Sequence, residues 1–429
     1  GVLSVRVHSA RQLGPSAVDL GWMSLASLPL LLLLGVRSAA LNTSQCIHVR
    51  DHGAKGDGNT DDSDAIEAAV AAAVAGQRDF KIANPHNHVR QHNLVGGPDL
   101  CFSPGDYRIT RTIDLSPKLD SVGSLASPPN VRGLGKVNVR LNSTAVDMFS
   151  AISAFWWEFT GMSMVGGRVQ LLVGNNNSDQ GQLLISDCAF QESAGAAVHM
   201  LPPAGPLVGF ANATHPNGLP IFPPPAGQTK WRGGYSTQLT LKDSKFIECN
   251  QVLVNWGDWT SVQDIWVTTS PTMTPNTAVF ENWDRLFVKR VLAVAGTHYE
   301  PSRKVAWFHN RAYRLSGGWL HMEEFRFSDD GGCSLLNIVN FAPLLCVPQR
   351  NPYDSNILCA TPEPGPLPKN ITWGQSSIIV KGGYLCGIPV AILLEQIPSQ
   401  LVLRDTANLP GNCQLRAQSL VSESSYNCC

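Results

Sequence analysis

DHGAKGDGNTDDSDAIEAAVAAAVAG, residues 51–76, decides how the rest of the chain is interpreted. The alternating apolar residues 47–49 predict a short strand before it, and three closely spaced glycines predict a loop. Residues 60–62 are Thr-Asp-Asp, which suits the start of a helix, and Gly76 suits its end. Apolar residues then recur at helical spacing on one face: Ile66, Val70 and Val74. The local order is therefore strand, glycine loop and helix.

This order suggests two cofactor sites, and both fail on specific residues. The dinucleotide fingerprint G-x-G-x-x-G is absent because the glycines fall as G-x-x-G-x-G, and the acids at 61, 62 and 64 would repel a pyrophosphate. A calcium loop starting at Asp57 would need glycine in place of Asp62 and glutamate in place of Ala68. We therefore expect no nucleotide and no metal here, and no cofactor for the chain.

Three elements in order carry a family resemblance. The first is D-x-G-A-x-G-D-G-x-x-D-D at residues 51–62, followed by the alanine-rich helix. The second is F-x-P-G-x-Y within LCFSPGDYRITRTIDL at 102–107, and the third is VRGLGKVNVRL at 131–141. This segment, residues 46–167, resembles the N-terminal signature of the pectate lyase superfamily of right-handed parallel β-helix proteins. The resemblance implies that the helix caps a solenoid, whose open end otherwise exposes unpaired strands.

Internal repeats favour the same fold. LLISDCAFQES (183–193) aligns without gaps with LTLKDSKFIEC (239–249), and LHMEEFRFSDD (320–330) fits the same frame. Looser copies begin at residues 157, 286 and 378. Each copy predicts a short strand, a bend and a second short strand, with loops or less visible rungs between copies. We expect an all-β fold: a right-handed single-stranded parallel β-helix with an N-terminal capping α-helix.

The domain boundaries follow from composition. LASLPLLLLLGV at 25–36 and the small residues after it predict a secretory signal cleaved near Ala40, and thus an extracellular protein. An uncleaved anchor is the alternative, and only then is a membrane expected; residues 1–22 fit neither pattern. Residues 1–40 are predicted to be the upstream segment and the signal, and residues 41–429 the β-helix domain. Within this domain the cap and the first rungs are expected at 46–167 and further rungs with insertions at 168–400. A cysteine-containing tail is expected at 401–429.

Several features suit secretion. The eleven cysteines match no zinc pattern, and an oxidising compartment favours disulfides. The resemblance places Cys46 and Cys101 on neighbouring strands, which implies a disulfide between them. Five N-x-S/T sequons predict glycosylation, at Asn42, Asn142, Asn176, Asn212 and Asn370. A net charge of −1 excludes a broad basic face for nucleic acid. His86, His88 and His92 lack neighbouring ligands, so no metal is predicted.

The resemblance implies a polysaccharide partner without fixing the chemistry. Only Asp329 and Asp330 in SDDGGC echo the polygalacturonase motifs. In VNWGDWTSVQDIWV and the residues after it, tryptophans flank acids, and flat rings beside carboxylates suit a sugar. We therefore predict a glycoside hydrolase with candidate acids Asp258, Asp329 and Asp330. Substrate binding is assigned to four side chains: Trp256, Trp259, Trp266 and Trp283.

Alternative functions and residue roles remain open. A non-catalytic carbohydrate-binding or adhesin-type protein is one, and a uronan lyase or epimerase using Lys304, Arg311 and Arg314 is another. The tryptophans can equally fill the core of a wide coil. Two columns of acids recur in the repeats, Asp187, Asp243 and Glu324, and Glu192, Glu248 and Asp329. They are either catalytic pairs on adjacent rungs or simple turn residues at the bends.

Overall fold

The protein divides into two units, Gly1–Ser44 and Gln45–Cys429. All elements described here belong to the second unit. The computed structural model describes residues 46–83, 90–95, 97–116, 128–151, 154, 156–174, 182–200, 238–257, 259–269, 277–295, 306–310, 318–329, 336–340, 345–346, 359–360, 372–373, 377–386, 390–394, 400–404, 413–419 and 422–428. The predicted signal at 25–36 and the proline-rich insertions at 201–226 and 361–368 lie outside these residues.

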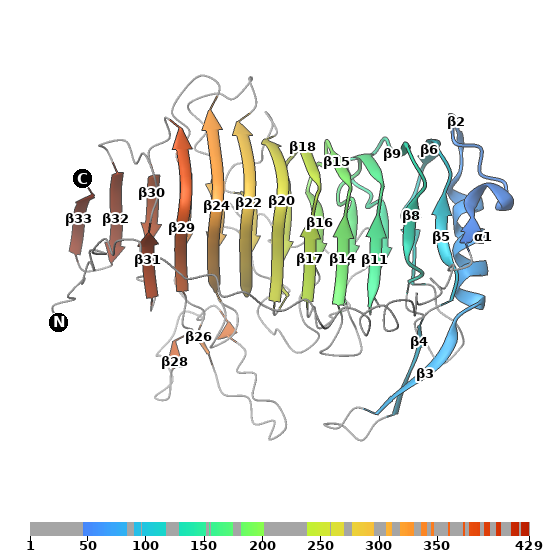
Figure 1. Ribbon diagram of the computed structural model, residues 1–429, viewed down its shortest axis with the longest axis horizontal. Helices are drawn as coiled ribbons and strands as arrows, with labels where there is room; N and C mark the ends of the chain where they lie inside the picture. Colours follow the sequence, from blue (N-terminus) through green and yellow to red (C-terminus); the bar gives the residue numbers. More distant parts are fainter. Residues whose placement is uncertain are drawn as a thin grey trace, which may run out of the picture. The chain divides into compact units, whose positions relative to one another are not determined.

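The first of two long sheets contains seventeen strands in the described part of the chain. Every pairing within it is parallel, and Figure 1 shows the strands standing side by side along the coil. The strands are β1 (Cys46–His48), β2 (Asp57–Asp61), β5 (Asp99–Phe102), β6 (Gly105–Ile109), β8 (Val131–Gly133), β9 (Val137–Leu141), β11 (Trp157–Thr160), β12 (Ser163–Gly166), β14 (Gln182–Ser186), β15 (Ala189–Gln191), β17 (Gln238–Lys242), β18 (Lys245–Cys249), β20 (Trp259–Thr269), β22 (Arg285–Ala295), β24 (Trp319–Asp329), β29 (Ser377–Cys386) and β31 (Gln400–Arg404).

The second long sheet contains the return strand of each rung. Its strands are β7 (Ile113–Asp114), β10 (Phe149–Ala151), β13 (Leu171–Val173), β16 (Ala196–Met200), β19 (Gln251–Asn255), β21 (Ala278–Asn282), β23 (Ala306–Asn310), β25 (Leu336–Asn340), β30 (Val390–Leu394), β32 (Cys413–Ser419) and β33 (Ser422–Cys428). Its pairings are parallel until β32 and β33, which are antiparallel. A rung thus consists of a strand, a bend, a second strand and a return strand, and the predicted β-helix class is confirmed.

Two small sheets accompany the coil. The antiparallel hairpin of β3 (Arg78–Ala83) and β4 (Arg90–Val95) lies in the chain between the predicted cap helix and β5. His92 lies in β4, whereas His86 and His88 are outside the described residues. The other sheet joins β26 (Leu345–Cys346), β27 (Cys359–Ala360) and β28 (Thr372–Trp373). Figure 1 draws both sheets beside the long strands.

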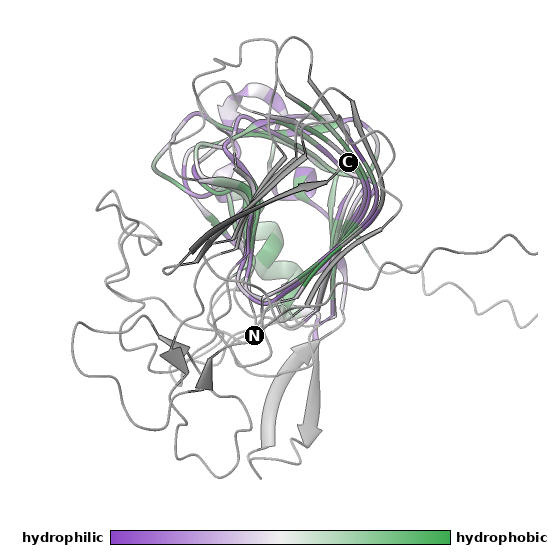
Figure 2. Cartoon of the chain, turned by 90° about the vertical axis from the view of Figure 1, so that its left-hand side faces the viewer, coloured by the Kyte–Doolittle hydropathy of each residue, from purple (hydrophilic) through white to green (hydrophobic). Residues whose placement is uncertain are grey.

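The helix α1 (Ser63–Ala75) caps the first rung, as predicted. It follows the short 3-10 helix η1 (Val49–His52) and contacts β1, β5 and β7. Its predicted face is buried: Ile66, Val70 and Val74 are at most 4% exposed. Figure 2, viewed along the coil, shows α1 across its far end. The helix therefore covers the apolar cross-section of the stack.

The glycine loop before α1 is held by an acid. The carboxylate of Asp62 accepts backbone N–H groups from Lys55 at 2.6 Å and from Gly56 at 3.1 Å. Asp61 instead accepts the Ser63 backbone N–H at 3.1 Å, at the start of the helix. The acids that would repel a pyrophosphate are thus parts of the cap itself.

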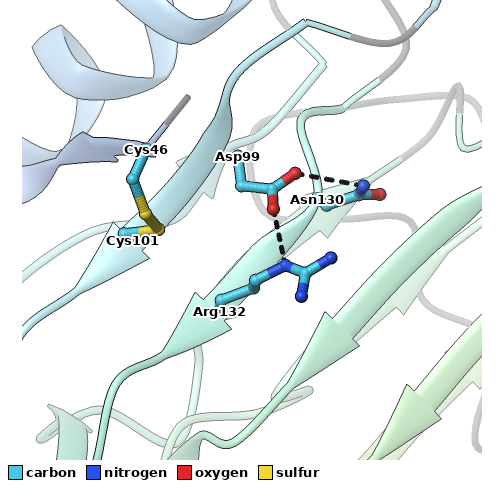
Figure 3. The surroundings of a disulfide bond; sticks show 5 residues. All are labelled: Cys46, Asp99, Cys101, Asn130 and Arg132. Carbon is cyan, nitrogen blue, oxygen red and sulfur yellow. Dashed lines mark hydrogen bonds and ion pairs between the residues drawn. A yellow bond between two sulfur atoms is a disulfide. The ribbon is translucent and has the colours of Figure 1, made fainter. Parts of the chain in front are cut away.

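The first rung is closed covalently. Cys46 in β1 and Cys101 in β5 form a disulfide, with Cα atoms 5.8 Å apart, so the pairing implied by the family resemblance is confirmed (Figure 3). Beside it, the Asp99 carboxylate pairs with the Arg132 guanidinium at 2.5 Å and accepts a hydrogen bond from Asn130 at 3.2 Å. Asp99 is buried, and both of its oxygens have partners, which a buried carboxylate requires.

The repeat frame is confirmed, and among the described residues one further rung lies between its recognised copies. The copies at 183–193 and 239–249 become β14–β15 and β17–β18, and the copy at 320–330 lies in β24. The additional rung is β20, a segment whose tryptophans the sequence predicts as substrate contacts. The stack also continues into the predicted tail, because β31 pairs with β29 and β32 pairs with β30.

The bends explain the recurrent acids. Asp187, Asp243 and Glu324 have φ of 52°, 50° and 52°, the left-handed region, and so do Asp264 and Arg290 at the same bend in β20 and β22. Asp and Asn adopt this region more readily than most residues, so the polar-turn interpretation is supported for this column. The second predicted column is not continuous. Glu248 lies in a register shift between β18 and β20, and Asp329 pairs with Ala295.

Buried side chains also stack from rung to rung. The rings of Phe190 and Phe246 lie 4.9 Å apart and nearly parallel, and Phe280 stacks on Phe308 in the same way. At the end of the second-sheet strands, Asn255 donates to Asn282 and Asn282 donates to Asn310, each at 2.8 Å. Register is thus specified by apolar stacking and by a buried amide ladder.

Candidate functional site

The pleat of the first sheet sends alternate side chains outward before each bend. In β14, for example, Leu183 and Ile185 are buried in the core, whereas Gln182 and Leu184 face outward. Parallel pairing keeps equivalent positions aligned from rung to rung, so the outward side chains form rows along the coil.

Three rows of outward side chains are named by their order along the strand. The first row is Trp156, Gln182, Gln238, Trp259, Arg285 and Trp319. The second is Glu158, Leu184, Thr240, Ser261, Phe287, His321 and Ile379, and the third is Thr160, Ser186, Lys242, Gln263, Lys289, Glu323 and Lys381.

The first row is unusually aromatic for an exposed surface. Trp156, Trp259 and Trp319 are 54%, 48% and 41% exposed. The Trp259 ring stacks on Phe287 of the second row, with centroids 4.5 Å apart, and the Arg285 guanidinium lies 5.2 Å from the Trp319 ring. These contacts hold the rings in place while one side stays open to solvent. The first two rows therefore present fixed aromatic faces across β20, β22 and β24.

A charged group lies beside the aromatic rings. His321 Nε2 is 2.9 Å from Glu323 Oε1, and the Lys381 and Lys289 ammonium groups approach the same carboxylate at 3.5 and 3.8 Å. Desolvation alone would raise the pKa of Glu323, but the His321 hydrogen bond and the nearby positive charges together lower it. Glu323 is thus kept ionised, which suits an orienting or basic group better than an acid that donates a proton.

A depression of about 520 Å³ continues these rows toward the capped end. Its lining spans β11 to β20 and includes Trp156, Glu158, Gln238, Thr240 and Lys242. The walls combine two tryptophans, Trp156 and Trp157, with amide, hydroxyl and charged groups. A recess of this size and mixed polarity can accept sugar rings.

The predicted tryptophans separate into three places. Trp259 lies in the first row, as a substrate contact requires, and Trp266 is 37% exposed but lies beyond the bend of β20. Trp256 and Trp283 are at most 1% exposed and stack on each other at 4.5 Å within the core. Their assignment to substrate binding is corrected, because a sugar ring cannot reach them. The core-filling alternative applies to this pair.

The side chains of the three predicted catalytic acids lie outside the described residues. Asp258 and Asp330 lie outside them, and of Asp329 only the backbone is described, at the end of β24. The cations considered for a lyase, Lys304, Arg311 and Arg314, are also outside. Of the sequons, only Asn142 falls on described residues.

Sequence reasoning missed most of the face that the structure assembles. Trp156, Phe287 and the group formed by Trp319, His321 and Glu323 lie in three distant segments of the chain. One signal was available: Thr260, Val262, Ile265 and Val267 are buried at alternating positions around Asp264, which matches the frame of Asp243. Recognising β20 as a rung would have aligned Trp259 with its neighbours.

Two features are absent from the described residues. Within the described ranges, no three histidine, cysteine, aspartate or glutamate side chains form a group that could hold a metal ion. No helix in this part of the chain is long and apolar enough to cross a membrane.

Comparisons with known proteins match the N-terminal part of the chain to one family model. Residues 46–160 match the model described as rhamnogalacturonase A/epimerase, pectate lyase-like. No curated protein matches the chain in sequence. Among solved structures, the Streptococcus pneumoniae surface adhesin PfbA is similar at 12% identity and TM-score 0.33, over 82% of this chain and 85% of the adhesin.

Two polysaccharide-modifying enzymes are similar to a comparable extent. An alginate lyase from Paenibacillus shares 10% identity at TM-score 0.32, over 79% of this chain and 95% of the lyase. A mannuronan C-5 epimerase module from Azotobacter vinelandii shares 12% identity at TM-score 0.28, over 84% and 95%. The match to the family model confirms the resemblance to the pectate lyase superfamily over residues 46–160, the segment that forms the capped end of the coil.

Proposed function

We propose that the protein binds a polysaccharide chain along the outward face of the first sheet, parallel to the coil axis. The observation that carries the proposal is the first row, in which three exposed indoles lie in line with amide and guanidinium side chains. A sugar ring stacks its C–H face on an aromatic ring while its hydroxyls hydrogen-bond to neighbouring polar groups. The matched family, named for a rhamnogalacturonase and an epimerase, supports a glycan as the partner.

The length of the row favours an extended chain over a single sugar. Trp156 and Trp319 are separated by five strand spacings, roughly 24 Å at 4.8 Å each. Gln182 and Gln238 lie between the first two indoles and can hydrogen-bond to hydroxyls there. Several sugar units can therefore contact the face at once, and their contributions add on one chain.

Acid–base chemistry on an acidic glycan is a second candidate, favoured by the group around His321. Glu323, kept ionised, accepts a hydrogen bond from Nε2 of His321, which orients the ring and leaves Nδ1 as the nitrogen that can act as a base. Lys289 and Lys381 lie beside the same carboxylate and can neutralise a uronate. In an elimination, the base would take the proton next to the carboxylate, and the bond to the leaving sugar oxygen would break to form a double bond. The unsaturated product is directly detectable.

Hydrolysis is the finer prediction from the sequence, and it rests on Asp258. This residue precedes Trp259 in the chain, and it needs a partner carboxylate at hydrolytic distance. Changing Asp258 to Asn keeps the shape and removes the proton-transfer group. If the protein is a glycosidase that uses Asp258, reducing-end release should fall by at least about a hundredfold with the fold intact.

Binding is tested with defined polysaccharides. Wild type is titrated with a β-1,3-glucan, polygalacturonate and alginate by calorimetry, and the products are screened for reducing ends and unsaturated sugars. For the glycan that binds, W259A and W319A should each weaken Kd by roughly thirtyfold, or about 2 kcal/mol, because exposed aromatic anchors dominate such contacts.

The matched control is W266A, which removes an indole of similar exposure beyond the bend. It should leave the affinity unchanged. Equal losses in W259A and W266A would contradict a binding site on the first row. Binding without any turnover would favour the adhesin-type function, and H321A abolishing an unsaturated product would favour the elimination.

A further inference from the structure

Asn142 begins a sequon, Asn142-Ser143-Thr144, directly after β9. Asn142 and Thr144 are exposed, and the Ser143 hydroxyl accepts the Ala145 backbone N–H at 3.3 Å. The acceptor amide thus lies at the outer surface of a turn rather than inside a strand. An exposed turn can carry a bulky glycan without disturbing the core.

A cavity of about 500 Å³ lies beside this turn. Its walls are formed by the sequon itself, by Leu141 and Val165, by Gly166 and Gly167 at the end of β12, and by Arg140 and Glu192. The glycines have φ of 81° and 79°, and a side chain on either would meet Leu141 or Met148. In the next two rungs, Glu192 and Glu248 occupy the corresponding left-handed bends. The hollow therefore arises where this rung has no side chain at its second bend.

The chemistry of the walls is mixed. Bare peptide groups and the hydroxyl of Thr144 offer hydrogen bonds, Leu141 and Val165 offer apolar contact, and Arg140 and Glu192 offer a donor and an acceptor. An N-acetylhexosamine has the matching parts: hydroxyls, an amide and an apolar methyl group. The volume lies in the range of small-ligand sites.

We propose that Asn142 carries an N-linked glycan whose first N-acetylhexosamine occupies this cavity. The proposal goes beyond the function of the first row and is independent of it, because it concerns a covalent sugar at another bend. It depends on entry into a secretory pathway, which the segment at 25–36 predicts.

Occupancy is tested on the full chain secreted from a eukaryotic cell line. Enzymatic deglycosylation in ¹⁸O water converts an occupied asparagine into labelled aspartate, which peptide mapping assigns to position 142. N142Q and T144A should abolish the label completely. S143A is the matched control: it changes the same turn but keeps the sequon, so the label should remain. Absence of the label in wild type, whether from failed translocation or an unused acceptor, overturns the proposal.

The position of the sugar is tested by the rate at which peptide N-glycosidase releases the glycan. Release from the folded protein should be several-fold slower than from the denatured protein. E192W, which fills the cavity, should accelerate release from the folded protein, whereas E248W, at the corresponding bend of the next rung, should not. Equal rates for folded and denatured wild type, or no difference between E192W and E248W, would show that the glycan does not occupy the cavity.

Discussion

The capped end of the coil and the rungs of β20, β22 and β24 use the same strand–bend–strand unit in different ways. At the capped end, α1, the Cys46–Cys101 disulfide and the Asp62 carboxylate all act on the first rung or the loop beside it. In the middle rungs, the two strands merge into one of eleven residues, and Trp259, Phe287 and Trp319 lie on the surface. The first region suppresses exposed edges and the second displays side chains.

The bends show the same difference. Gly161, at the bend between β11 and β12, has φ of 71° and presents no side chain. Asp264, Arg290 and Glu324 hold the corresponding conformation with long or charged side chains, and Arg290 pairs with both acids. A non-glycine residue in this conformation costs roughly 1 kcal/mol, and surface ion pairs return less than that. The middle rungs therefore keep charged bends at a small cost in stability.

The largest effect should come from breaking the cap. In I66D/V70D, two carboxylates face the apolar end rung, and burying unpaired charge costs several kcal/mol. We expect loss of the native transition in urea and aggregation on gel filtration, because the first rung is uncovered.

A control separates charge from position. A68D/A71D adds the same two acids on exposed positions of α1. It should lower stability only by the helix propensity difference, below about 1.5 kcal/mol in total. A monomeric I66D/V70D with wild-type melting would contradict a capping role for the helix.

Removing the disulfide should rank second. C46S/C101S opens a link between residues 55 apart in sequence, and closing a loop of that length contributes about 4 kcal/mol in the chain-entropy model. The urea midpoint should fall accordingly while the fold is retained. Wild type in reducing agent is the internal control and should match the variant. A midpoint unchanged in both cases would mean that α1 and the first strands hold the end rung without the bond.

The third prediction concerns the buried amide ladder of the middle rungs. Asn282 is fully buried, accepts from Asn255 and donates to Asn310. N282A leaves a donor and an acceptor of its neighbours without this partner, which should cost about 2 kcal/mol in urea unfolding. Q238A, an exposed amide of the first row, should change stability by less than about 0.5 kcal/mol. Equal effects would show that the ladder adds nothing beyond surface amides.

The capped end could be predicted from the sequence to a greater extent than the middle rungs. The cap, its buried face and the first-rung disulfide are specified by contiguous motifs, so the strand at 46–48, the helix at 63–75 and the Cys46–Cys101 pair were accessible. The core and bend roles in the repeats were accessible in part, because acids recur at fixed offsets from apolar residues.

The outward face could not be predicted from the sequence, because it depends on the register between strands that are separated by insertions. Trp259 was found through local composition, but the same argument selected Trp256 and Trp283, which are buried. Composition cannot distinguish a ring that points outward from one that points inward, since a shift of one residue reverses the face. His321 and Glu323 lie in the recognised repeat copy at 320–330, but nothing in that copy indicated a site.

The smallest effect is expected at the charged bend, where two contributions can be separated. The Arg290 guanidinium donates to Asp264 at 2.5 and 2.6 Å, and this hydrogen bond is the main reason that the pKa of Asp264 is lowered. D264N removes the charge and keeps a residue that tolerates the left-handed conformation, so unfolding at neutral pH should weaken by about 0.5 kcal/mol or less. The folded protein depresses the pKa of Asp264, so the ion pair adds to the stability above the ordinary pKa of the carboxyl. This contribution is lost as the pH falls through the lowered value, so wild type and D264N should converge in acid.

D264A also removes the backbone preference and should lose about 1 kcal/mol more at every pH. If D264N and D264A are equally destabilised, the ion pair rather than the conformation determines the bend, and the charged side chains of the middle rungs hold the fold after all.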